Sequence, residues 1–150
     1  MKLKVLIGAG DRILLCALPS AVIVVVANVL KPSWFAMGFG LTALIIGLVL
    51  LAIGVPTWVA SVALVLIEVP RRRLITSGPF AVVRHPLYVA VSLLVLPGLG
   101  FLLDSWLVIA LGVILYVFAR IFSPIEEKVL ESVFPREYPA YRSRVLLPWL

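Results

Sequence analysis

The 150-residue chain has little charge, a single cysteine and a single histidine. Only 13% of its residues are charged whereas 63% are hydrophobic, and its mean hydropathy is +1.21. The apolar share is well above the roughly 45–50% of an ordinary soluble domain. One cysteine excludes an intramolecular disulfide and a cysteine-rich metal site, and no Gly-x-Gly-x-x-Gly follows a strand, as a Rossmann nucleotide-binding unit would require. We therefore predict an all-α integral membrane protein.

The net charge of +6 would suggest nucleic-acid binding in a soluble protein. Here the cations form short patches beside apolar runs. We interpret them as determinants of topology that also contact anionic lipid head groups. The expected partners are membrane lipids, with no nucleic acid, and no feature of the sequence sets an oligomeric state.

Four apolar runs predict about four transmembrane helices. They cover residues 13–30, 34–69, 87–103 and 106–122. We interpret the first run as a retained span because it is long for a signal peptide and no small-x-small cleavage site closes it. The chain is predicted to be one membrane domain, residues 1–150, with N-terminal spans in 1–70 and a second half, 71–150, that carries the polar residues.

The second run is too long for one straight crossing. An unbroken helix over residues 34–69 would reach roughly 50 Å, whereas a hydrocarbon core is about 30 Å thick. The helix must therefore break or protrude, and Gly54-Val55-Pro56 is the predicted place for a break, because proline interrupts the helical hydrogen bonds. One crossing followed by a shorter interfacial helix fits the length better than two crossings.

Charges divide unequally between the two predicted sides of the membrane. Lys31 and Asp104 fall on one side, and nearly all other charges fall on the other: Lys2, Lys4, Arg12, Arg71 to Arg73, Arg84 and the basic tail. By the positive-inside rule the second side is cytoplasmic. The prediction is a multi-pass protein with four crossings, both termini in the cytoplasm and a helical cytoplasmic tail.

Two polar segments interrupt the apolar pattern, residues 68–88 before the third span and 123–150 after the fourth. Because the third and fourth spans are predicted to form a hairpin, the start of one and the end of the other are neighbours. Five side chains are therefore expected to meet at the cytoplasmic face: Arg84, His85, Tyr88, Glu126 and Glu127.

Each of these residues also has a simpler interpretation. Pro86 suits the first turn of a helix, so the preceding Arg-His pair could lie at the head-group level. Ser123 and Glu126 match a capping box at a helix start. Tyrosines in the two segments could be interfacial anchors: Tyr88, Tyr138 and Tyr141. A metal site is disfavoured because the chain has no second histidine.

The ordered motifs resemble a known family. The stretches "LITSGPFAVVRHPLYVAV" and "EEKVLESVFPREYPAYRSRV", separated by a short apolar hairpin and closed by Pro-Trp, are similar to membrane methyltransferases of the isoprenylcysteine carboxyl methyltransferase family and to their phospholipid methyltransferase relatives. The resemblance covers residues 74–150. Ala90 stands where that family often has glycine, "FPREY" replaces the usual Phe-Gly-x-x-Tyr, and Pro124 lies close before the glutamates.

The resemblance implies methyl transfer from S-adenosylmethionine to a lipid-like or isoprenylated acceptor. It implies that the cofactor-binding residues are His85, Tyr88, Glu126 and Glu127, and that the catalytic residues are Arg84 and Glu127. Arg84, Tyr141 and Arg142 are then expected to bind the acceptor.

The chemistry of the acceptor separates two cases. A carboxylate needs only a cation to orient it, for which Arg84 is the candidate. An amine arrives protonated and needs a base, for which His85 or a glutamate is available. Two other classes of protein stay open: a steroid-reductase-like membrane enzyme that uses NADPH, and a non-enzymatic scaffold or transporter subunit. The absence of ionisable residues from the middle of the spans disfavours a transporter.

Overall fold

The computed structural model describes residues 10–148. Within that range the chain is helical apart from turns and one isolated bridge between Val83 and Leu147. Lys2 and Lys4 of the predicted basic N-terminus, like the side chain of Arg12, lie outside the described part. The predicted all-helical fold is confirmed for the described residues.

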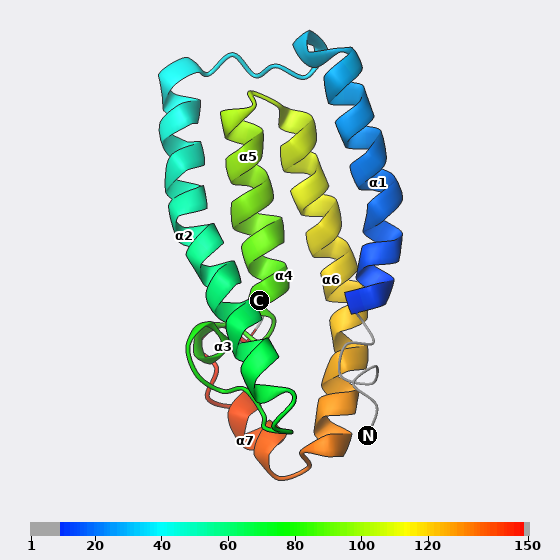
Figure 1. The fold of residues 1–150 in the computed structure, drawn as a ribbon, viewed down its shortest axis with the longest axis vertical. Coiled ribbons are helices and arrows are strands. Elements are labelled where there is room, and N and C mark those ends of the chain that lie inside the picture. Colours follow the sequence, from blue (N-terminus) through cyan, green and yellow to red (C-terminus); the bar gives the residue numbers. More distant parts are fainter. Residues whose placement is uncertain (1–9, 149–150) are drawn as a thin grey trace.

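Two long helices and two further helical segments form an antiparallel arrangement (Figure 1). The elements in chain order are α1 (Gly10–Leu30), η2 (Pro32–Trp34), α2 (Gly40–Glu68), α3 (Pro79–Val82), α4 (Pro86–Val89), the π-helical turn η3 (Ala90–Val95), α5 (Leu96–Leu102), α6 (Trp106–Val133) and α7 (Glu137–Arg142). The segment from α4 to α5 packs between α2 and α6, and α1 packs on the other side of α6. The predicted hairpin of the third and fourth runs is confirmed.

The outer surface of this arrangement is apolar. Within the described residues, α2 and α6 are long and apolar enough to cross a membrane, and shorter apolar helices cover Ala17–Leu30 and Pro86–Leu102. Large side chains such as Leu15, Leu41 and Leu66 are about 70% exposed. Contiguous apolar surface on this scale indicates contact with lipid, so the fold is that of a membrane protein.

The predicted break in the second run does not occur. Helix α2 continues through Pro56, although proline removes one hydrogen bond of the ladder. Gly54 lies against Leu94 and Val95, which holds α2 close to the neighbouring hairpin at this point. Tertiary packing on both sides of the proline therefore outweighs the lost bond, and no separate interfacial helix forms here. Because 29 residues reach about 43 Å, the end of α2 projects beyond a hydrocarbon core.

A helix start at Ser123 is also absent. Helix α6 runs through Pro124, and the Ser123 hydroxyl donates a hydrogen bond to the Ala119 carbonyl at 2.5 Å instead of capping a new helix. Glu126 is therefore not a capping residue. One continuous helix carries both glutamates from the apolar region into the polar end of the protein.

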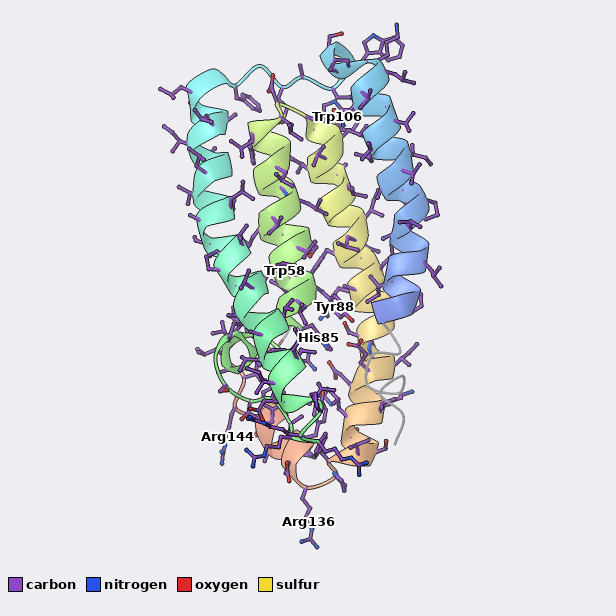
Figure 2. All side chains as sticks on the ribbon, in the orientation of Figure 1. Trp58, His85, Tyr88, Trp106, Arg136 and Arg144 are labelled. Atoms are coloured by element: carbon purple, nitrogen blue, oxygen red, sulfur yellow. The ribbon has the colours of Figure 1, made fainter. Side chains whose placement is uncertain are left out.

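Polar and charged side chains separate into two ends. Asp104 lies in the turn between α5 and α6, and its carboxylate accepts hydrogen bonds from the N–H groups of Met37 and Gly38 at 3.1 and 3.0 Å. The loop after α1 is thereby held against this turn. Figure 2 shows Trp106 near this end, whereas His85, Arg136 and Arg144 lie toward the opposite end.

Candidate functional site

A glycine and two prolines shape the chain before the third helical segment. Gly78 has a φ of +61°, a conformation that favours glycine, and Pro79 then begins α3. Pro86 begins α4, where proline needs no N–H partner. The carbonyl of His85 accepts the first helical hydrogen bonds, from the N–H groups of Tyr88 and Val89 at 3.1 Å. The predicted helix start at Pro86 is confirmed, and it places His85 at the mouth of the hairpin.

The five predicted side chains meet, as expected. Arg84 Nη1 lies 2.7 Å from Glu127 Oε1, and His85 Nε2 lies 3.4 Å from the same oxygen. His85 Nδ1 lies 3.4 Å from Glu126 Oε2, and the Tyr88 hydroxyl donates a 2.7 Å hydrogen bond to Glu126 Oε1. The connection between α3 and α4 thus contributes the basic groups and α6 contributes the two carboxylates of one cluster, which we call the Arg-His-Glu cluster. Figure 2 shows His85 and Tyr88 directed into the interior between the helices.

Burial gives the Arg-His-Glu cluster its electrostatic character. The side chains of Arg84, His85 and Glu127 are only 11%, 12% and 16% exposed. Burial by itself would lower the pKa of His85, but its hydrogen bonds to Glu126 and Glu127 and their negative charge raise that pKa above the ordinary 6.5. His85 is therefore stabilised as a cation between two carboxylates.

Close packing of the hairpin positions Tyr88 opposite Glu126. The π-helical turn η3 begins two residues after Tyr88, and the Ser92 hydroxyl bonds the Tyr88 carbonyl at 2.6 Å. On α6, a Cβ added to Gly112 would collide with the Ser92 carbonyl. Glycine at this position lets the two helices of the hairpin approach closely.

An apolar cavity of about 190 Å³ adjoins the Arg-His-Glu cluster. Arg84, His85, Tyr88 and Glu126 form its polar side. The rest of its wall is mainly hydrophobic and includes Val65, Val69, Leu74, Leu87, Leu130 and Phe134. A predominantly apolar cavity with a few convergent polar groups is typical of a small-molecule site.

The tail after α6 is fastened across α3. The Tyr141 hydroxyl donates to the Phe80 carbonyl at 2.8 Å, and the Leu147 N–H donates to the Val82 carbonyl at 2.9 Å. Arg84 also donates to the carbonyl of Pro148. The tail thus covers the site from the polar end. Tyr141, predicted to bind the acceptor, lines the apolar cavity but uses its hydroxyl for this backbone contact.

A second, more open cavity of about 390 Å³ lies on the tail side of Arg84, and we call it the outer cavity. Arg142, the remaining residue predicted to bind the acceptor, is exposed and lines this cavity together with Glu131. Arg142 is therefore near the site but outside the Arg-His-Glu cluster.

Tyr138 is the residue that sequence reasoning missed. The sequence predicts an interfacial tyrosine here, yet Tyr138 is only 2% exposed and lines both the apolar and the outer cavity. Its hydroxyl has no hydrogen-bond partner among the described residues. Burial raises the pKa of Tyr138 above its ordinary value and that of Tyr141 to about 12, so both phenols stay neutral donors. The feature of the sequence that could have indicated this burial is the three-residue spacing of Tyr138 and Tyr141, which places both on one face of a short helix.

Metal ligands do not gather in the described part of the chain. No group of three or more His, Cys, Asp or Glu side chains there is arranged to hold a metal ion. The polar groups at the site are instead suited to bind organic ligands through hydrogen bonds and charge.

The fold and the site together define a helical membrane protein with a ligand cavity at its polar end. Comparison with known proteins identifies the family: the chain belongs to the phospholipid methyltransferase family, whose profile matches residues 34–137. The resemblance inferred from the ordered motifs is confirmed, and the matched region contains the whole Arg-His-Glu cluster.

Two curated relatives are similar to this chain. Protein-S-isoprenylcysteine O-methyltransferase B of Arabidopsis thaliana is 31% identical over 119 residues, which are 77% of this chain and 60% of the relative. Cobalt-zinc-cadmium resistance protein CzcN of Cupriavidus metallidurans is 40% identical over 74 residues, 47% of this chain and 32% of the relative. The chain therefore spans less than two thirds of the length of each. No solved structure matches the chain significantly.

Proposed function

We propose that this protein is an S-adenosylmethionine-dependent methyltransferase that acts at the membrane on a lipid-like or isoprenylated acceptor. The observation that carries the proposal is the Arg-His-Glu cluster, which adjoins an apolar cavity at the polar end of a membrane helix hairpin. Membership of the phospholipid methyltransferase family supports the reaction class.

The residues around the apolar cavity fit this cofactor by the chemistry of their groups. Glu126 lines the cavity, and Glu127 contacts its lining residues Arg84 and His85. Both glutamates are acceptors, which suit the ribose hydroxyls and the ammonium group of S-adenosylmethionine. The apolar wall suits its adenine ring. The buried Tyr138 hydroxyl, which has no partner among the described residues, offers a further polar contact.

S-adenosylmethionine, when bound, would supply the methyl group. The protein's own tasks are then to align the two ligands and to exclude water. His85, Tyr88, Glu126 and Glu127 would bind the cofactor, and the tail fastened across α3 would shield it from solvent. Arg84 would orient a carboxylate acceptor, whereas Glu127 would take the proton from an amine acceptor.

We further propose four membrane crossings with the site on the cytoplasmic side. The helices alternate in direction, and the end that carries the Arg-His-Glu cluster also carries Arg71 to Arg73, Arg136 and Arg144. Excess Lys and Arg are typical of cytoplasmic loops. An acceptor with an apolar chain could then reach the cavity from the bilayer.

Equilibrium binding of S-adenosylhomocysteine to the detergent-purified protein tests this function. We expect saturable binding that is lost in His85→Ala and Glu127→Gln. Glu68→Gln is the matched control, because Glu68 pairs with the exposed Arg71 at the surface, 3.4 Å away. Its binding should equal that of the wild type.

NADPH serves as the competitor that separates the enzyme classes. If the site is that of a methyltransferase, NADPH should not reduce the binding of S-adenosylhomocysteine. Competition by NADPH would instead favour a steroid-reductase-like enzyme. Absence of S-adenosylhomocysteine binding in a folded sample would reject the proposal and favour a non-enzymatic scaffold or transporter subunit.

A further inference from the structure

Two buried hydrogen-bond donors at the site lack partners. The Tyr138 hydroxyl and Arg84 Nε are both inaccessible to solvent, and neither bonds to any described residue. Most buried polar groups in proteins are hydrogen-bonded, and leaving one unpaired is destabilising. Two unpaired donors at one site are therefore available to a ligand.

The two residues that carry these donors line the same cavities. Arg84 and Tyr138 each line both the apolar cavity and the outer cavity, so they form part of the wall between them. The rest of the Arg84 guanidinium is engaged, Nη1 with Glu127 and Nη2 with the Pro148 carbonyl. Of the guanidinium nitrogens only Nε is left without a partner, and its N–H is a donor that cannot act as an acceptor.

We propose that Tyr138 is a ligand-binding residue and that its hydroxyl, together with the Nε–H of Arg84, forms a subsite for a carboxylate. The inference rests on the proposed function and adds the chemistry of one bound group. A carboxylate satisfies both donors at once, and its bond to Arg84 is charge-assisted. An ammonium group has only donors and leaves Arg84 Nε unpaired.

Two ligands of the proposed reaction could supply this carboxylate. One is the amino-acid end of S-adenosylmethionine, and the other is an acceptor that is methylated on a carboxylate. The surroundings of His85 agree with the second source, because the two carboxylates 3.4 Å from its ring favour the protonated imidazole, which cannot take a proton from an amine acceptor.

The test compares matched pairs of ligands that differ only in the carboxylate. The first pair is S-adenosylhomocysteine and its decarboxylated counterpart. The second is N-acetyl-S-farnesylcysteine and its carboxamide. Equilibrium affinities are measured separately for each ligand on the wild type and on Tyr138→Phe, which removes only the hydroxyl.

We expect Tyr138→Phe to weaken binding of the carboxylate member of one pair by about 10- to 100-fold, the usual loss for a hydrogen bond to a charged group. Its partner without the carboxylate should bind unchanged. Selective loss in the first pair assigns the subsite to the cofactor, and selective loss in the second assigns it to the acceptor. Equal losses within both pairs, or no loss in either, would overturn the proposal.

Two further variants guard against a structural effect. Tyr116→Phe makes the same change on α6 at a position that lines neither cavity, and it should leave all four affinities unchanged. Arg84→Lys keeps the charge beside Glu127 but removes Nε–H, and it should reproduce the selective loss. Tyr138→Phe should unfold at the wild-type temperature or above it, because the hydroxyl that it removes is unpaired.

The proposal and the proposed function fail in different ways. If the wild type does not bind S-adenosylhomocysteine, the methyltransferase function is rejected, and the farnesylcysteine pair alone decides the subsite. If the wild type binds S-adenosylhomocysteine but Tyr138→Phe discriminates in neither pair, only the carboxylate subsite is rejected. Wild-type protein that binds none of the four ligands overturns both.

Discussion

The guanidinium of Arg84 lies 2.7 Å from Glu127 although the two residues are 43 positions apart in the chain. Arg84 lies two residues before α4 begins, and Glu127 lies in the last two turns of α6. The contact therefore closes the open end of the hairpin. Because both side chains are largely buried, breaking this pair has a larger effect than breaking a surface pair.

We expect Arg84→Ala to lower the free energy of unfolding by about 3 kcal/mol, because Glu127 and the Pro148 carbonyl lose a buried partner. Arg71→Ala is the control. Arg71 is 59% exposed and lies 3.4 Å from Glu68, so that change should cost less than about 1 kcal/mol. Denaturant unfolding in detergent measures both, and equal losses would contradict a buried, structurally important pair.

His85 should make stability depend on pH. Burial alone would lower its pKa, but Glu126 and Glu127 raise it in the folded protein. Tyr88 stacks on the His85 ring, and Arg84 shares Glu127 Oε1 with it. A raised pKa stabilises the fold fully below the unfolded value of 6.5, and this contribution is lost as the pH rises through the folded value.

The measurement is the melting temperature of the wild type and His85→Gln between about pH 5.5 and pH 8.5, a range in which histidine titrates. The melting temperature of the wild type should exceed that of the variant most at the acidic end of this range, and the difference between the two temperatures should shrink as the pH rises. A difference that is constant across the range, or that grows with pH, would show that His85 is not held as a cation.

Gly54 should tolerate no side chain. A Cβ at this position would lie 2.7 Å from Leu94 Cβ, so Gly54→Val must push α2 away from the hairpin. We expect a loss of about 1–3 kcal/mol in unfolding free energy. Because Val65 and Val69 at the end of α2 line the apolar cavity, ligand binding should weaken as well.

Ala52→Val is the matched control for Gly54→Val, because Ala52 is exposed on the same helix. It should change neither the unfolding free energy nor ligand binding. If both variants lose the same stability, the close approach at Gly54 is not what holds α2 in place.

Cysteine labelling tests the proposed topology. In a Cys16→Ser background, Ser33→Cys and Ser132→Cys place single exposed thiols at opposite ends of the protein. A membrane-impermeant thiol reagent should label Ser33→Cys in intact cells and Ser132→Cys only after permeabilisation. Labelling of both from the same side would contradict four crossings with a cytoplasmic site.

Much of the site could be predicted from the sequence, because it depends on the positions of the apolar runs and on one short turn, which are local features of the chain. Apolar runs set the helices, and the short turn at Asp104 forces the third and fourth runs to be neighbours. Because the two runs are neighbours, Arg84 and His85 come close to Glu127. The sequence was misleading at Pro56 and Pro124, where local rules predict helix ends but the helices continue.

The prolines and Tyr138 show what only the tertiary structure decided. Whether a helix survives a proline depends on what packs beside it, and for α2 that is a hairpin more than 30 residues further along the chain. Whether a tyrosine is an interfacial anchor or a buried donor depends on how the tail crosses α3. The amino-acid order by itself determined the class of protein, the hairpin and the meeting of the charged residues, since these follow from hydropathy and short connections. Burial, the unpaired donors and the two cavities arise from contacts between distant segments, so they appear only when the chain is folded.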